Sequence, residues 1–321
     1  MRANTCGWNS RQTTCWSCAI KPVIIHDGYL TTKPHLYGRG ALLVGLAFLW
    51  MGVFLFAPLA GLSALAFASR GEYGGVEWTF TWENLSRLAG HDEFGFSWNH
   101  LLILWRSVVL AAVTTVLCLL IGFPMAFWIA ARPAAARPLL LALVMVPSCV
   151  NLVIRTYAWQ QFLGSQMPAA WVAQHLGLVP DGASLYPTVT AVYLGMVSAM
   201  LPFTVLPLYT SVERLDWSLV EAARDLHAGR LRTFRHGILA QCMPGLLAAT
   251  ILTFIPSLGM FVISDMLGGA KFLLVGNLIQ QQFGSMNNWP FGATAGLFLV
   301  IASLFALWGL RIVSEREAGR R

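Results

Sequence analysis

The stretch Leu215–Gly245 reads LDWSLVEAARDLHAGRLRTFRHGILAQCMPG and separates two long apolar regions of the chain. Asp216 or Ser218 is placed to cap a helix start, because short side-chain oxygens accept hydrogen bonds from the first free amides. Glu221 follows Ser218 at the three-residue spacing of a capping box. The sequence therefore predicts a short polar helix that begins near Asp216.

Apolar residues in this stretch recur at helical spacing. The first stripe consists of Leu219, Ala222, Ala223 and Leu226. Gly229 then indicates a break, and a second stripe among basic residues consists of Leu231, Phe234 and Ile238. The pattern predicts an amphipathic helix–turn–helix. Such an element either lies on anionic lipid or docks a partner protein, and periodicity alone does not separate these two interpretations.

The composition of the whole chain is that of a membrane protein. Of 321 residues, 57% are hydrophobic and 11% are charged, and the mean hydropathy is +0.64. A soluble domain carries about 25% charged residues, so a soluble enzyme, a disordered chain and a disulfide scaffold are excluded. The net charge of +7 is scattered through the loops, and we assign it to membrane topology rather than to a nucleic-acid partner.

Several stretches without Asp, Glu, Lys or Arg reach the roughly 20 residues that a membrane span needs. They are Ala41–Ser69, Ser107–Ala131, Pro138–Ile154, Gly182–Val212, Gly237–Ser264 and Phe272–Leu310. The third stays apolar to about Leu163 and is expected to span. The last is too long for one helix and its first half is polar, so we place the final helix near Phe291–Leu310. The sequence predicts an all-α polytopic protein with about six transmembrane helices.

Basic residues indicate the orientation, because Lys and Arg collect in cytoplasmic loops. Most of the 21 Lys and Arg residues lie in the N-terminal segment, in the loop around Glu221 and in the C-terminal tail. We expect both termini and this loop in the cytoplasm, and the loop Arg70–His100 outside. The expected organisation is a cytoplasmic segment 1–40, a transmembrane domain 41–310 with a cytoplasmic loop 213–243, and a tail 311–321.

The sequence offers little for chemistry within the chain. It has no G-x-x-x-x-G-K-[ST] phosphate loop, so ATP hydrolysis would need another chain. Its seven His residues are dispersed, and Cys15 and Cys18 form a C-x-x-C that lacks the second pair usual in zinc sites. We expect no catalytic residue, no metal and no cofactor.

Three strings carry a family resemblance. Glu221-Ala222-Ala223-Arg224-Asp225-Leu226 resembles the EAA loop of bacterial ABC-importer permeases. AKFLLVGN at 270–277 and NWPFGA at 288–293 resemble the spermidine/putrescine permeases of the PotB type. The resemblance covers roughly Leu42 to Leu310. It implies an ABC-importer permease (MetI-like) fold in the bacterial inner membrane.

The resemblance also implies partners and a docking site. In that family the EAA loop forms a coupling helix that sits in a groove on the ATP-binding subunit. The implied docking residues are Glu221, Ala222, Ala223, Asp225, Leu226, His227 and Gly229. The implied partners are two ATP-binding subunits, a second homologous permease and an extracytoplasmic polyamine-binding protein. The chain itself would be non-catalytic and would move polyamines by alternating access.

This chain departs from the family pattern at three positions. The family places Gly at His227, and usually Ile at Gly237 and Pro at Ala240. The family's glycine at the position of His227 indicates a turn residue with positive φ. His tolerates that conformation better than most residues. Either His227 adopts the conformation or Gly229 takes over the turn.

Residues of a substrate pathway are harder to identify. Ionisable residues inside a membrane are functional candidates, and Asp265 is the acidic one here. Further candidates are Tyr157, Trp159, Phe261 and Asn151. Alternatively, Asp265 caps a helix or pairs with Lys271, and the aromatics anchor helices at the interface. Two other functions remain open: a permease for iron, thiamine, phosphate or another small solute, and an ion-coupled secondary transporter.

Overall fold

The structure is a computed structural model that describes residues 34–318, except 72–74, 93–94, 97, 176, 178–179, 181 and 270–271. The C-x-x-C of Cys15 and Cys18, most of the predicted N-terminal segment and Lys271 lie outside the described residues. The chain divides between Ala57 and Pro58 into two units, and the contacts described below lie within the second.

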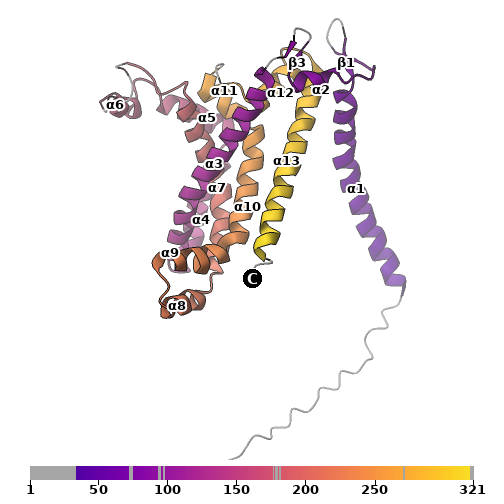
Figure 1. Cartoon of the computed structure of the whole chain (residues 1–321). Helices are drawn as coiled ribbons and strands as arrows, with labels where there is room; N and C mark the ends of the chain where they lie inside the picture. Colours follow the sequence, from indigo (N-terminus) through magenta and orange to yellow (C-terminus); the bar gives the residue numbers. More distant parts are fainter. Residues whose placement is uncertain are drawn as a thin grey trace, which may run out of the picture. The chain divides into compact units, whose positions relative to one another are not determined.

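Helices make up most of the described chain (Figure 1). The first half contains α1 (Pro34–Ala66), β1 (Ser69–Arg70), β2 (Val76–Glu77), α2 (Glu83–Leu88), β3 (His91–Asp92), β4 (Gly95–Phe96), α3 (Asn99–Ala130), α4 (Arg137–Cys149), α5 (Leu152–Phe162) and α6 (Pro168–His175). The second half contains α7 (Val189–Glu213), α8 (Trp217–Asp225), α9 (Arg230–Arg232), the π-helix η1 (Thr233–Leu239), α10 (Ala240–Gly259), α11 (Val262–Gly268), α12 (Val275–Phe283) and α13 (Trp289–Ala318). The strands form two antiparallel pairs, β1–β2 and β3–β4.

Five helical segments of the described chain are long and apolar enough to cross a membrane. They are Val44–Ala66, Asn99–Ala130, Val189–Glu213, Arg230–Gly259 and Trp289–Ile312. The all-α polytopic fold is therefore confirmed. The final span begins at Trp289, close to the predicted start, and the polar stretch before it holds the short helix α12.

The third predicted span differs from a single helix. It consists of α4 and α5, which meet at an angle of 89°. Asn151 Oδ1 accepts a hydrogen bond from the Val153 amide at 2.8 Å and so caps α5. Arg155 on α5 reaches back and donates to the Pro147 carbonyl of α4 at 3.2 Å. The stretch predicted to span therefore consists of two helices that pass the length and hydropathy test only together. A local cap and a side-chain donor stabilise the ends that the bend exposes.

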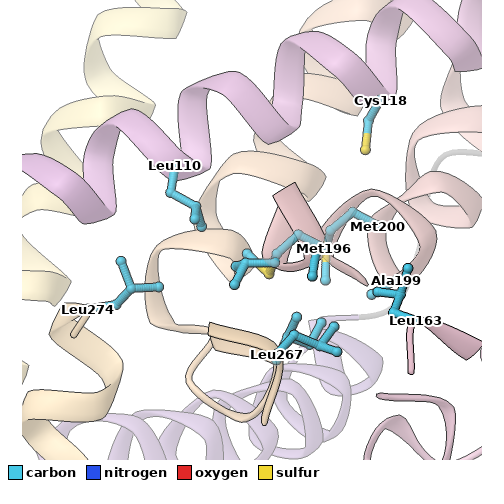
Figure 2. Close-up of a cluster of buried hydrophobic side chains, with 11 residues drawn as sticks. Leu110, Cys118, Leu163, Met196, Ala199, Met200, Leu267 and Leu274 are labelled. Atoms are coloured by element: carbon cyan, nitrogen blue, oxygen red, sulfur yellow. The ribbon is translucent and has the colours of Figure 1, made fainter. Parts of the chain in front are cut away.

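Helices α3, α7 and α10 pack against one another and form the centre of the bundle. Figure 2 shows a buried cluster to which Leu110 of α3, Met196 of α7 and Leu267 of α11 contribute. Small residues allow the close approach. A Cβ built on Gly245 would lie against Ser211 Oγ and 2.5 Å from the Pro207 carbonyl oxygen. Close backbone contact of this kind is how helices associate in lipid.

Candidate functional site

Helix α8 lies in the connection between α7 and α10, at one end of the bundle (Figure 1). Its N-cap is Asp216, whose carboxylate accepts a hydrogen bond from the Ser218 amide at 2.9 Å. Ser218 lies inside the helix, so the capping box with Glu221 does not form. Of the two caps that the sequence allowed, the structure selects Asp216.

The end of α8 is closed by His227. This residue has φ 55, whereas Gly229 has φ −60. The Ala228 amide donates to the Ala223 carbonyl at 3.1 Å and the His227 amide to the Arg224 carbonyl at 2.9 Å. These two bonds constitute a Schellman motif, in which the left-handed position is usually Gly. His227 therefore takes the turn position where the family has glycine.

The chain returns to the bundle through η1, which continues into α10 without a break. Gln241 fastens this return to the start of α8. Its side-chain oxygen accepts from the Asp216 amide at 3.0 Å, and its amide donates to the carbonyls of Asp216 at 3.3 Å and Gly237 at 2.7 Å. Sequence reasoning missed Gln241, because periodicity does not predict which backbone groups a side chain will meet across a turn.

A second link joins the end of α7 to α4. Glu213 forms a 3.2 Å ion pair with Arg137 and accepts a hydrogen bond from the Tyr209 hydroxyl at 2.9 Å. Arg137 also donates to the Arg132 carbonyl at 2.9 Å. Glu213 therefore anchors the chain just before α8, and Gln241 anchors the chain after it to the N-cap of α8.

The predicted apolar stripe of α8 is exposed rather than packed against the chain. Val220, which the stripe omitted, is 1% exposed, whereas Leu219 and Leu226 are 56% and 84% exposed. Leu231 beyond the turn is 81% exposed. Thr233, at the start of η1, is buried instead, with 5% of its surface exposed.

The exposed side chains border a groove of about 760 Å³ between α8 and η1. Ala223, Leu226, His227 and Ala228 line one wall, and Arg232, His236, Gly237 and Gln241 line the other. Glu221, Ala222, Asp225 and Gly229 are also exposed. The predicted docking residues therefore lie together on one short, largely uncovered element.

The candidate pathway residues lie on, or at the N-cap of, two helices that pack against each other, α5 and α11. Tyr157 is 54% exposed and Phe261 39% exposed, and Asp265 is exposed on α11. Trp159 packs on the buried cluster and lines a cavity of about 440 Å³ with Tyr193 and Ser198. Asn151 differs from the others, because its side chain caps α5.

The described residues contain no group of three or more His, Cys, Asp or Glu side chains that could hold a metal ion.

Arg155 is the residue between the candidate pathway positions whose contact the sequence did not predict. Its bond to Pro147 exists only because the third span bends, and nothing in the hydropathy pattern predicts that bend.

Comparisons with known proteins agree with this architecture. Residues 118–318 match the family described as binding-protein-dependent transport system inner membrane component. The spermidine/putrescine transport system permease protein PotB of Escherichia coli (strain K12) is 38% identical over 252 residues, which is 78% of this chain and 89% of that protein. PotB of Haemophilus influenzae is 36% identical over 258 residues, covering 80% of this chain and 88% of its own length.

The fold also matches solved structures. A bacterial alginate ABC transporter in complex with an alginate pentasaccharide-bound periplasmic protein superimposes with a TM-score of 0.66 at 14% identity, covering 88% of this chain and 95% of that chain. At this identity the likeness concerns the fold alone. The long apolar helices, the EAA-like loop on α8 and the matched family lead to one assignment: this chain belongs to the inner membrane components of binding-protein-dependent transport systems, the non-catalytic permease subunits of ABC importers.

Proposed function

We propose that this chain is the permease subunit of an ATP-driven polyamine importer and forms part of its translocation pathway. The observation that carries this proposal is identity of 36–38% over most of the chain with spermidine/putrescine permeases. The complete transporter would contain a second homologous permease, two ATP-binding subunits and an extracytoplasmic polyamine-binding protein. Both termini and α8 would face the cytoplasm, because most Lys and Arg residues lie in the terminal segments and in the loop that contains α8, and such residues collect on the cytoplasmic side.

In this proposal α8 is the element that receives the movement of the ATP-binding subunits. Its exposed leucines supply apolar contact area, and Glu221 and Asp225 supply charge at the same surface. Docking would cover Leu226, which has 84% of its surface exposed in the isolated chain. Burial of exposed apolar surface is the main favourable contribution to such an interface.

Charge reversal on α8 tests the docking role. Glu221→Arg should abolish co-purification of the ATP-binding subunit and polyamine uptake, while the permease still accumulates in the membrane. Glu77→Arg reverses the charge of another exposed glutamate, on β2, and as the matched control it should leave assembly intact. Normal assembly and uptake in the Glu221→Arg transporter would contradict the docking assignment.

The substrate requires a separate experiment. Cells that carry the complete transporter should take up spermidine and putrescine, and these should compete with each other but not with iron, thiamine or phosphate. Vesicles without ATP should not transport, even under an ion gradient. Uptake of another solute in this panel would contradict the polyamine assignment but not the assignment as an ABC permease. Gradient-driven transport without ATP would contradict the assignment to ABC importers.

We also propose that Asp265 attracts the polycation at the α5–α11 surface, with Tyr157, Trp159 and Phe261 contributing cation–π contacts. The packing of α11 against α5 supports this, because it brings the carboxylate and the aromatic side chains onto neighbouring helices. Asp265→Asn should lower spermidine uptake, and Asp265→Glu should retain most of it. Equal uptake by the two variants would contradict the role of the charge.

A further inference from the structure

A polar cavity of about 440 Å³ lies where β1, α2, α3 and α13 come together (Figure 1). Its lining residues are Arg70, Arg87, His100, Gln282, Ser285, Met286, Asn288 and Phe291. Among these described residues two are arginines and none is acidic. The transport role proposed above makes no use of this cavity.

The depth of the cavity in the membrane follows from the helices beside it. Helices α1, α3 and α13 each contain a span, and Arg70 follows the end of α1, His100 lies in the first turn of α3 and Asn288 precedes α13. Because a span ends where hydrocarbon gives way to lipid headgroups, the cavity lies at the depth of the lipid phosphates. Trp98 and Trp289 are 71% and 44% exposed at the same helix ends, as in an interfacial aromatic belt.

Hydrogen bonds between the lining segments hold the cavity in shape. Arg70 donates to the Met286 carbonyl at 3.2 Å, which ties β1 to the connection before α13. Asn84 of α2 and Thr294 of α13 donate to the same Ala66 carbonyl, at 3.2 and 3.1 Å. The polar side chains are therefore presented by segments that are anchored to the ends of the spans.

The chemistry of the cavity suits a phosphate group. A guanidinium carries five N–H donors in a planar fork that matches phosphate oxygens, so Arg70 can bind a ligand as well as Met286. His100 Nδ1 is buried without a hydrogen-bond partner, and its ring packs edge-on against Phe291 at 5.2 Å between centroids. Arg87 already pairs with Glu83 at 2.8 Å, so the positive charge for a ligand comes chiefly from Arg70.

The position of this charge also indicates a specific use. In the proposed orientation Arg70 lies outside the cell, where Lys and Arg are scarce in this chain because such residues collect in cytoplasmic segments. A polycationic substrate is repelled by an arginine and so is not the occupant. An anion at the depth of the headgroups satisfies both the charge and the buried imidazole nitrogen.

We propose that this cavity binds the phosphate of an anionic phospholipid of the outer leaflet, with Arg70 and His100 as its main donors. The bound lipid then ties β1 and α2 to the ends of three spans. Only the choice of leaflet rests on the proposed function, since the binding itself does not depend on which substrate the transporter carries.

The experiment titrates the full-length chain, purified in detergent, with phosphatidylglycerol and counts bound lipid by native mass spectrometry. Ser285→Asp places a carboxylate on the cavity wall without removing the bond between Arg70 and Met286, and it should raise the dissociation constant about fivefold. Ser285→Asn is the uncharged control of similar size and should bind like the wild type. Arg70→Gln should weaken binding about fivefold, and Arg70→Lys should retain most of it.

Thermal unfolding gives a second measurement on the same samples. Phosphatidylglycerol should raise the melting temperature of the wild type and of Ser285→Asn more than that of Ser285→Asp, because a ligand stabilises the fold that binds it. Equal dissociation constants for Ser285→Asp and Ser285→Asn would overturn the proposal. Displacement of the lipid by an equal concentration of glycerol 3-phosphate would identify a free phosphate site and also overturn it. Spermidine uptake by the wild type tests the proposed function separately from either result.

Discussion

The bundle of α3, α7 and α10 and the loop element of α8 and η1 use the same residue types in opposite ways. In the bundle, Leu208 and Val205 are completely buried against other helices of the chain. In the loop element, Leu226 and Leu231 are 84% and 81% exposed. The bundle is thus packed by its own side chains. The loop element is fixed by hydrogen bonds to backbone groups and leaves Leu226 and Leu231 exposed.

The largest effect is expected where the bundle is tightest. Gly245→Val would place side-chain atoms against Ser211 and within 2.5 Å of the Pro207 carbonyl oxygen, and backbone cannot move aside without separating α7 from α10. We expect a loss of about 4–5 kcal/mol, at the upper end for one substitution. Unfolding in detergent measures it. Gly309→Ala adds a Cβ with no neighbouring atom within 4 Å inside α13, and it should not lower stability.

Two leucines test the comparison directly. Leu208→Ala should lower stability by about 3 kcal/mol through lost packing in the bundle. Leu226→Ala should change it by less than about 0.5 kcal/mol, because the side chain contacts little of its own chain. Thermal unfolding of both variants, combined with pull-down of the ATP-binding subunit, separates the roles. Only Leu226→Ala should weaken assembly without lowering stability, and equal losses of stability would refute the contrast.

His227 tests whether the loop element carries backbone strain. A non-glycine residue in the left-handed conformation costs about 1–2 kcal/mol, so His227→Gly should relieve part of it. Because glycine also gains entropy in the unfolded chain, we expect a net gain of about 0.5–1 kcal/mol. Gly229→Ala is the control: with φ −60 and no atom within 4 Å, it should be tolerated. Destabilisation by His227→Gly would show that the imidazole makes a contact that outweighs the strain.

The difference between the regions also explains what the sequence could predict. Long apolar stretches predict the spans, because hydrocarbon thickness fixes the length of a helix. Capping and 3.6-residue spacing predict α8 and a start at Asp216 or Ser218, of which the structure has Asp216. The bend between α4 and α5 was missed, since Pro147 within a span is common and does not determine direction. Leu226 is exposed, as either lipid contact or docking would require, but spacing predicts a stripe and not which molecule covers it.

Contacts across sequence were also beyond prediction. Gln241 meets Asp216 only after the chain has turned through α8, and Arg70 meets Met286 across most of the chain. Both contacts are made to backbone groups, the amide of Asp216 and the carbonyl of Met286, so no pair of side-chain types identifies them in advance. The ion pair between Arg137 and Glu213 could not be predicted either, because the sequence offers several oppositely charged partners for each of these residues.

The smallest expected effect concerns the contact between α8 and η1. A Cβ built on Gly237 would meet Val220 and Thr233 at 3.8 Å, which is ordinary van der Waals contact. Gly237→Ala should therefore stabilise the chain by about 0.5 kcal/mol through reduced backbone entropy of the unfolded state. Gly195→Ala is the contrasting variant in the bundle, where the new atom would lie 2.6 Å from Leu267, and it should destabilise. If both substitutions destabilise in thermal unfolding, the loop element is packed as tightly as the bundle. Opposite signs follow only if α8 is held mainly by the hydrogen bonds of Gln241 and Asp216, which leave room beside Gly237.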